Sequence, residues 1–297
     1  MRGLPHPAPD RILQKRRLLA ALGVTVAALA LEVVGGLLSR SLALLADATH
    51  LFADIAALTL AYAAINLADR APTGKHTFGL SRAEVLAAFV NAQILLVVAL
   101  YVLYRSFIRF QEPVEVRAGL MFWVALAGLA ANLVAMGLLA GGRAGSLNVR
   151  AAYLEVLSDM LGSLAVVAAA VLIPLTGWAW LDAGVSGAIA LFILPRAVSL
   201  LRQTAHILLE GAPREVDLPA LRRRLLELPG VEEVHDLHFW TLTSGQHSAS
   251  LHIRASSETP RGEVLEAVRL LLRQEADMDH ATIQVEWGSD TICASHP

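Results

Sequence analysis

Residues 41–67 have the sequence SLALLADATHLFADIAALTLAYAAINL. A helix needs about 20 mostly apolar residues to cross a lipid bilayer, so this stretch is long enough to span one. It nevertheless carries three ionisable side chains, Asp47, His50 and Asp54. His50 and Asp54 are i, i+4 and share one helix face, toward which Asp47 also leans. Because an ionisable group inside a span is energetically costly, this pattern indicates a functional site within the membrane.

Five further apolar segments have the length of membrane spans, at about residues 18–38, 84–107, 118–140, 151–174 and 181–201. Of the 297 residues, 56% are hydrophobic and 17% are charged. Soluble domains have about 45–50% apolar and about 25% charged residues, so the composition excludes an ordinary soluble enzyme and a disordered chain. The net charge of -2 offers no basic surface, and we expect no nucleic-acid partner.

A second pair of acidic residues lies in the fifth segment, within RAAYLEVLSDMLGSL. Glu155 and Asp159 are again i, i+4, and no Lys or Arg lies near the centre of either pair. Two helices that each present such a pair can supply four ligands to one ion, the number that zinc favours. A pocket this negative is tolerable only with a metal cation or protons, so we predict metal or proton coupling.

Purely structural roles for these residues remain open. Asp47 could be an interfacial acid, and His50 with Asp54 could form a hydrogen-bonded pair that clips two helices together. The other polar residues inside the spans are Glu32, Asn91, Gln93, Asn132 and Asp182. They could line a pathway, but hydrogen bonding between helices is the favoured interpretation. Glycines such as Gly128 and Gly162 are expected to let helices approach closely.

The character of the chain changes at about residue 212, where charge rises and apolar runs of membrane length end. Residues 217–228 have helical spacing, and Pro229-Gly230 ends that helix. Alternation predicts strands over 231–242, 248–254 and 281–287, and residues 261–277 form a second amphipathic helix. The fold class is therefore an all-α domain of six transmembrane helices followed by a small α+β domain of order αββαβ.

Positive charges near the span ends predict the orientation in the membrane. The N-terminal tail and the links after the second, fourth and sixth spans carry the excess of Arg and Lys. We expect a multi-pass protein of the inner (plasma) membrane with both termini in the cytoplasm. Its parts are a tail at 1–17, a transport domain at 18–211 and a cytoplasmic domain at 212–297. The first apolar run is too long for a cleaved signal peptide.

The sequence resembles the cation diffusion facilitator family of divalent metal/proton antiporters, which includes bacterial zinc and cadmium exporters. The resemblance extends from about Arg16 to Trp287. It rests on SLALLADATHLFAD (41–54), HTFGLSRAEVLAA (76–88), NVRAAYLEVLSD (148–159), VHDLHFWTL (234–242) and HATIQVE (280–286). The family implies six spans, cytoplasmic termini, a metallochaperone-like tail and a homodimer in the lipid bilayer.

The resemblance also implies a transport site formed by His50, Asp54, Glu155 and Asp159, with Asp47 as a further candidate. Glu155 departs from the family pattern, which has His there, so the site gains an oxygen ligand in place of a nitrogen ligand. Carboxylates suit Mn and Mg better, while imidazole suits Zn, Co and Fe. Zn(II), with Cd(II), is the first choice of cargo and protons are the counter-ion. A Mn(II), Fe(II) or Co(II) exporter of the same fold is the alternative.

In the tail, His235, His252 and Glu286 match positions of cytoplasmic metal ligands in the family, although a strand His is more often a surface or packing residue. Gln284 falls where some relatives have His. The family's further site after span two is matched only by His76, because Leu80 replaces its second His.

The expected mechanism is alternating access, in which protons compete with the metal for the four ligands. Rival classes are an intramembrane metalloenzyme, which would need a nucleophile or base beside an open metal position, and a membrane-anchored metal sensor. Neither His-Glu-x-x-His nor Gly-x-Ser-x-Gly occurs in the chain, so we do not expect an enzyme.

Overall fold

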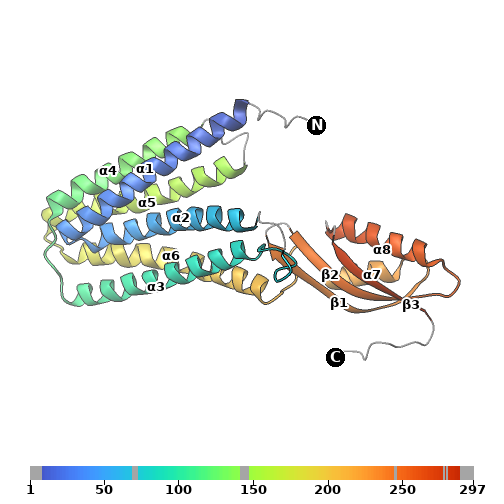
Figure 1. Cartoon of the computed structure of the whole chain (residues 1–297). Coiled ribbons are helices and arrows are strands. Elements are labelled where there is room, and N and C mark those ends of the chain that lie inside the picture. The colour runs from blue at the N-terminus through green and yellow to red at the C-terminus, as the bar shows by residue number, and fades with distance from the viewer. Residues whose placement is uncertain are drawn as a thin grey trace. The chain divides into compact units, whose positions relative to one another are not determined.

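The computed structural model describes residues 9–68, 73–140, 147–243, 246–276, 278 and 280–287 (Figure 1). The side chains of Asp54 and Glu155 lie outside the described residues, although the backbone of both belongs to helices. The chain packs as two compact units. One comprises residues 1–60 and 90–201, and the other comprises residues 61–89 and 202–297.

The membrane part consists of long helices. They are α1 (Pro9–Ser39), α2 (Leu42–Ala68), α3 (Ala83–Gln111), α4 (Ala118–Ala140), α5 (Leu147–Thr176) and α6 (Trp180–Leu208). Among the described residues, all of these except α2 contain a stretch long and apolar enough to cross a membrane. In α2 the described apolar stretch is Leu42–Ala53, within a helix of 27 residues. The helical membrane domain predicted from the sequence is confirmed.

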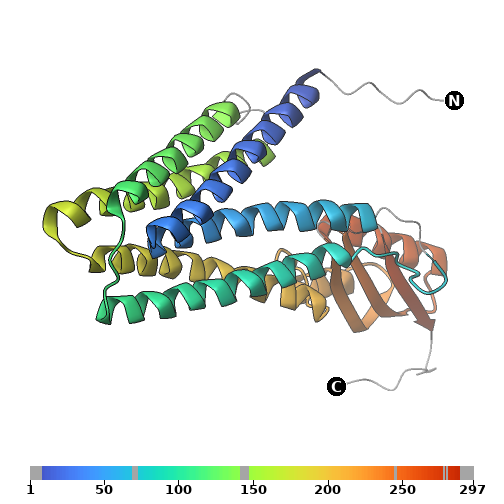
Figure 2. The ribbon, with the colours of Figure 1, turned by 60° about the vertical axis from the view of Figure 1, so that its left-hand side comes forward.

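Helix α2 packs against other helices on two sides, as its place in Figure 2 illustrates. Ala46 packs with Val102 of α3 and Ala190 of α6. On its other side, Leu44 belongs to an apolar cluster with α4 and α5. Small side chains such as Ala46 let neighbouring backbones approach closely, which is the usual packing of helices in a membrane. The stretch of α2 that carries Asp47 and His50 therefore lies inside the bundle.

Large apolar side chains cover the outer surface of the bundle. Val97, Phe107 and Leu175 are 64%, 64% and 75% exposed. An apolar surface of this extent would be an aggregation liability in water. Lipid tails are as apolar as these side chains, so the surface is suited to a bilayer.

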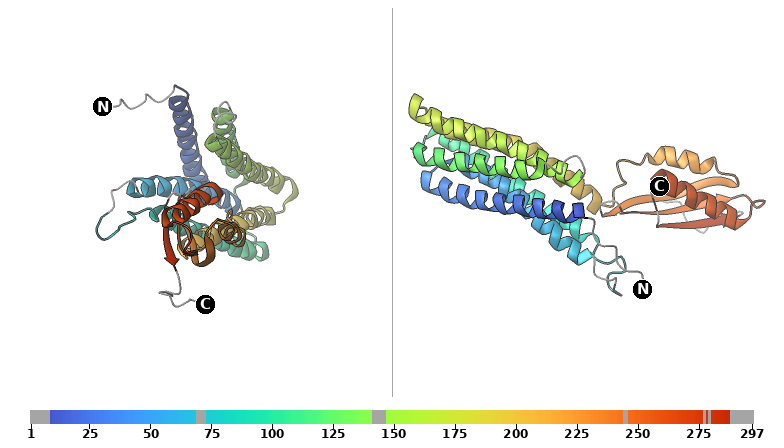
Figure 3. Two further views of the ribbon diagram at one scale, coloured as in Figure 1. Left: turned by 90° about the vertical axis from the view of Figure 1, so that its right-hand side faces the viewer. Right: turned by 90° about the horizontal axis from the view of Figure 1, so that it is seen from above.

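The C-terminal part consists of α7 (Leu218–Leu226), β1 (Val231–Thr243), β2 (Gln246–Ala255), α8 (Arg261–Ala276) and β3 (Ala281–Trp287). The strands form one sheet in the order β1-β2-β3, with β1 and β2 antiparallel and β2 and β3 parallel (Figure 3). This is the αββαβ order expected from the sequence. The parallel pairing is possible because α8 carries the chain back along the sheet.

Both helices pack on the sheet through one apolar core. Its buried members are Leu221, Leu225, Val234, Phe239, Ala249, Leu251, Ile253, Ala255, Val264, Val268, Leu271, Leu272 and Met278. Helix α7 begins at Asp217, whose carboxylate accepts a hydrogen bond from Ala220 N at 3.0 Å. Such a cap satisfies a backbone N–H at the helix start. Because one face of the sheet is used for this core, side chains on the alternate positions are free to meet on the other face.

Candidate functional site

The structure brings together one member of each predicted pair in the membrane. His50 on α2 and Asp159 on α5 lie with Nε2 and Oδ1 2.8 Å apart. Both are buried, with 7% and 5% of their surface exposed. Two groups that bind metal ions therefore meet from different helices inside the bundle.

The other two predicted ligands belong to the same helices. Asp54 is four residues after His50 in α2, and Glu155 is four residues before Asp159 in α5. Their side chains lie outside the described residues.

Asp47 is held by a chain of hydrogen bonds from α4 and α5. Asn132 Nδ2 donates to Ser163 Oγ at 3.1 Å, and Ser163 Oγ donates to Asp47 Oδ2 at 2.9 Å. All three residues are buried. For Asn132 the sequence-based preference for hydrogen bonding between helices therefore describes what the structure shows. Ser163, which completes the chain, was missed by sequence reasoning, because a lone Ser in a span carries no distinctive signal.

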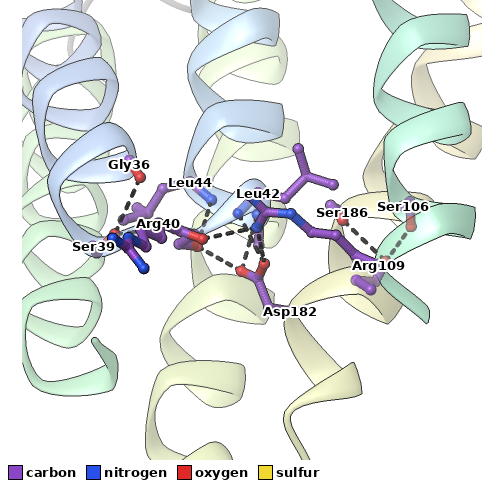
Figure 4. A network of polar contacts seen from close by, with 12 residues as sticks. Gly36, Ser39, Arg40, Leu42, Leu44, Ser106, Arg109, Asp182 and Ser186 are labelled. Carbon is purple, nitrogen blue, oxygen red and sulfur yellow. Dashed lines mark hydrogen bonds and ion pairs between the residues drawn. The ribbon is translucent and has the colours of Figure 1, made fainter. Parts of the chain in front are cut away.

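Asp182 at the start of α6 organises the start of α2 (Figure 4). Its carboxylate accepts hydrogen bonds from Ser41 Oγ at 2.6 Å, Leu42 N at 2.8 Å and Ala43 N at 3.1 Å. It also lies 3.1 Å from Arg109 Nη1 of α3. Asp182 therefore serves as the N-terminal cap of α2 from another helix, and it is only 2% exposed.

The link between α1 and α2 is equally well defined. Arg40 has a left-handed backbone with φ of 59°, and Ser41 N donates to Gly36 O at 3.1 Å. Arg109 Nη1 donates to Arg40 O at 2.8 Å. A non-glycine residue in this conformation costs of order 1–3 kcal/mol and persists only where its surroundings hold it. The contacts in Figure 4 hold this turn, which fixes the helix that carries Asp47 and His50.

The three predicted ligands of the tail form one cluster on the sheet. His235 on β1 is the register partner of His252 on β2, so their side chains project from the same face. His235 Nε2 lies 3.4 Å from Glu286 Oε2, and His252 Nδ1 lies 3.2 Å from Glu286 Oε1. One ligand atom from each of the three lies within 4.8 Å of the others. Two imidazoles and one carboxylate at this spacing fit a zinc ion.

A second acidic residue lies beside this cluster. Asp236 occupies an irregular position in the β1 ladder, with φ of 51°. Its carboxylate lies 2.8 Å from His238 Nε2 and 3.8 Å from His252 Nε2. Alternation alone would have turned Asp236 away from His235, so sequence reasoning did not place it here. Gln284, the position where some relatives have His, donates from Nε2 to Glu286 Oε1 at 2.8 Å.

Comparisons with known proteins identify the family to which the chain belongs. Residues 18–209 match the family model of the cation efflux transmembrane domain, and residues 213–287 match that of the cation efflux protein cytoplasmic domain. The chain is 45% identical over 282 residues to the metal cation efflux system protein CzcD of Cupriavidus metallidurans, covering 95% of this chain and 88% of that protein. It is 42% identical over 274 residues to the zinc transporter ZitB of Escherichia coli, covering 92% and 87%.

Two further comparisons concern a more distant relative and one domain. The cadmium, cobalt and zinc/H(+)-K(+) antiporter of Bacillus velezensis is 37% identical over 260 residues, covering 86% of this chain and 83% of that protein. A solved structure of the metal-bound C-terminal domain of the CzcD transporter is 40% identical, with a TM-score of 0.23. It covers 24% of this chain and 99% of that chain.

Fold and comparisons together define a multi-pass membrane transporter for cations. The ionisable residues meet on facing helices of an apolar bundle, and a small α+β domain follows them. The chain belongs to the cation diffusion facilitator family, as the two family models and the relatives over most of its length show. The family consists of transporters, so the chain is not an enzyme.

Proposed function

We propose that the protein exports a divalent metal ion, Zn(II) in first place and Cd(II) beside it, through a site formed by His50, Asp54, Glu155 and Asp159. The observation that carries this proposal is the 2.8 Å separation of His50 Nε2 and Asp159 Oδ1 inside the bundle. An imidazole and a carboxylate from two helices are typical ligands of zinc. Helical spacing supplies the other two ligands from the same helices.

Export would proceed by alternating access and in exchange for protons. The ligands must be deprotonated to bind a metal ion, so metal uptake expels protons and protonation favours release. His50 suits this exchange, because the unperturbed pKa of imidazole, about 6.5, lies near physiological pH. The Bacillus relative is named as a cadmium, cobalt and zinc/H(+)-K(+) antiporter, and this name supports the proposal of proton exchange.

The choice of metal depends on the ligand chemistry. CzcD is named for metal cations in general and ZitB for zinc, and both align over most of this chain. Glu155 supplies an oxygen ligand where the family pattern has the nitrogen ligand of His. This substitution raises the relative affinity of the site for Mn(II). Export of Mn(II), Fe(II) or Co(II) is the second candidate function, and among these ions Glu155 favours Mn(II).

The cytoplasmic domain would bind a regulatory zinc ion at His235, His252 and Glu286. Their distances support this assignment, because three ligand atoms already converge without rearrangement of the sheet. We also propose that two chains associate through this domain, in keeping with the family model of the cytoplasmic domain. In this arrangement both termini face the cytoplasm, and the protein lies in the inner membrane.

Reconstitution of the purified full-length protein into sealed lipid vesicles tests the proposal. A zinc-sensitive dye inside the vesicles should report zinc entry, and an acidic vesicle interior should accelerate it, because luminal protons leave in exchange. Collapse of the pH gradient with a protonophore should slow entry again. If none of Zn(II), Cd(II), Mn(II), Fe(II) and Co(II) enters, the transport function is wrong. If zinc enters at a rate that ignores the gradient, only the proton exchange is wrong.

A further inference from the structure

Glu32 of α1 is a buried acid that the four-ligand site does not use. It is 1% exposed, and neither of its carboxylate oxygens accepts a hydrogen bond from the described residues. Burial of a charged group without a partner is costly, and native proteins seldom retain one without a role. Among the described residues, Glu32 is the buried carboxylate for which both oxygens lack a hydrogen-bond partner.

Two glycines make room for Glu32 and for Asp47. A Cβ atom at Gly128 of α4 would collide with Glu32 Oε1, and one at Gly162 of α5 would lie 2.8 Å from Asp47 Oδ1. The sequence suggested that these glycines serve close helix packing. The structure shows that the atoms they admit are carboxylate oxygens.

A hydrogen bond orients Asp47, and Glu32 is buried in the same helical bundle. The hydrogen bond from Ser163 Oγ to Asp47 Oδ2 fixes one oxygen of Asp47 and leaves Oδ1 over Gly162. The negative charges of Asp47 and Asp159 both act on Glu32, so the three carboxylates are electrostatic neighbours. Four helices, α1, α2, α4 and α5, thus meet around these three buried acids, the acidic cluster.

In their ionised forms, the acids of this cluster are not balanced by basic side chains. Among the described residues, neither Glu32 nor Asp47 forms an ion pair with Lys or Arg. His50 is the basic side chain whose charge acts on Asp47, and it lies beside Asp159. One imidazolium cannot offset three carboxylates in a medium of low dielectric constant. The acidic cluster is therefore suited to a divalent cation.

We propose that Glu32 and Asp47 form a second metal subsite, which receives the transported divalent ion from the four-ligand site on its way out. The inference rests on the proposed transport function. Asp47 precedes His50 by about one helical turn, or about 5 Å, in the direction of the link between α1 and α2. The subsite therefore lies beside the first site and nearer to the end of the bundle where α2 begins.

The ligand chemistry agrees with a role in release. Glu32 and Asp47 offer only oxygen atoms, whereas the first site includes the imidazole of His50. Oxygen ligands suit Mg(II) and Mn(II), and they hold Zn(II) less firmly than a site with imidazole does. Passage through a membrane requires sites that bind well enough to be entered and weakly enough to be left. An oxygen-only subsite after a mixed site provides that gradient of affinity.

Glu32→Gln is the decisive variant, because it keeps the shape of the side chain and removes its charge. A neutral amide costs less to bury than a carboxylate, so the variant should fold at least as well as the wild type. In the vesicle assay its maximal zinc flux should fall by at least about tenfold, the lower range for losing a group that supports metal binding. The zinc concentration that gives half-maximal flux should not change, since loading uses the first site.

Zinc binding by the full-length protein in detergent provides the second readout. In a background of His235→Ala and His252→Ala, Glu32→Gln should bind one zinc ion fewer per chain at saturation and keep the tighter one. Wild-type flux in Glu32→Gln would overturn the subsite. Loss of both membrane-bound ions would overturn it as well, because Glu32 would then support the first site.

Gly128→Ala tests the same acidic cluster without changing its charge. The new methyl group would displace Glu32, so flux should fall as in Glu32→Gln. Gly137→Ala is the matched control, since it lies on the same helix and its Cβ would meet no atom within 4 Å. Equal flux in the two alanine variants would contradict the inference. A wild type that transports no divalent ion would instead refute the proposed function itself.

Discussion

Asp182 accepts a hydrogen bond from Ser41 Oγ at 2.6 Å, and this contact joins the start of α6 to the start of α2. The same carboxylate binds two backbone N–H groups of α2 and lies 3.1 Å from Arg109 Nη1. One buried acid thus fixes the beginning of the helix that carries Asp47 and His50. Its carboxylate holds the ends of α2, α3 and α6 together.

Asp182→Ala should lower the stability of the membrane domain strongly. It removes hydrogen bonds to a charged acceptor, each worth about 1.5–3 kcal/mol, and it leaves Arg109 without its carboxylate partner. Asp182→Asn should destabilise less, because the amide oxygen still accepts a bond from the start of α2. Thermal unfolding in detergent measures both. Glu112→Gln, at an exposed carboxylate in the link after α3, is the control and should unfold like the wild type. Equal losses in the Ala and Asn variants would show that a neutral oxygen acceptor cannot replace the carboxylate here.

Asp159→Ala and His50→Ala should each abolish zinc flux, while the protein remains folded. Each removes one of four proposed ligands, and the two side chains are 2.8 Å apart in the bundle. Vesicle flux and size-exclusion profiles of the two variants check this. Glu112→Gln again serves as the control, because it removes a carboxylate from outside the bundle. Rapid zinc entry through either alanine variant would exclude this pair as the transport site.

Glu155→His should shift the preference of the transporter toward Zn(II) over Mn(II). Imidazole matches zinc better than a carboxylate does, so the flux ratio of the two metals should rise in the variant. A second imidazole should also change the dependence of flux on pH between about pH 6 and 8, where histidine titrates. Competitive transport of both metals by wild type and variant gives the ratio. An unchanged ratio would mean that Glu155 does not bind the transported ion.

His235→Ala together with His252→Ala should remove one zinc ion from the cytoplasmic domain of the full-length protein. The two rings are neighbours, with centroids 5.3 Å apart, and both approach Glu286. Isothermal titration in detergent should show one tight site fewer. His280→Ala is the control, since His280 is exposed and lies outside the cluster. Binding that survives the double change would place the site elsewhere.

The sequence was sufficient to predict features that depend on one segment. The apolar length of residues 41–67 and the i, i+4 spacing of His50 and Asp54 are local, so they predicted a span with a functional face. The alternating residues of β1 and β2 likewise predicted the αββαβ order, which the sheet confirms. For His50 and Asp159, the sequence predicted that their two helix faces supply ligands to one ion. It did not predict the direct contact between these two side chains.

The particular partners in several contacts between distant segments were not predicted. Asp182 binds backbone groups of residues more than a hundred positions away, and backbone N–H groups leave no mark in a sequence. The sequence around Glu32 and Gly128 carries no signal that the two residues are in contact. Their close approach appears only once α1 and α4 are packed together. Asp236 joins the cytoplasmic cluster because its left-handed backbone interrupts the alternation of β1.

The place of Glu286 on β3 has a consequence for how the protein is made. β1 and β2 form a hairpin of neighbouring strands, but β3 reaches β2 only after the chain has passed through α8. During synthesis, the two histidines are therefore complete before the carboxylate that joins them exists. A metal ion that needs all three would bind only the finished sheet, and its binding would favour the finished sheet over any earlier form. Availability of the metal in the cell would then influence the yield of mature protein as well as its transport activity.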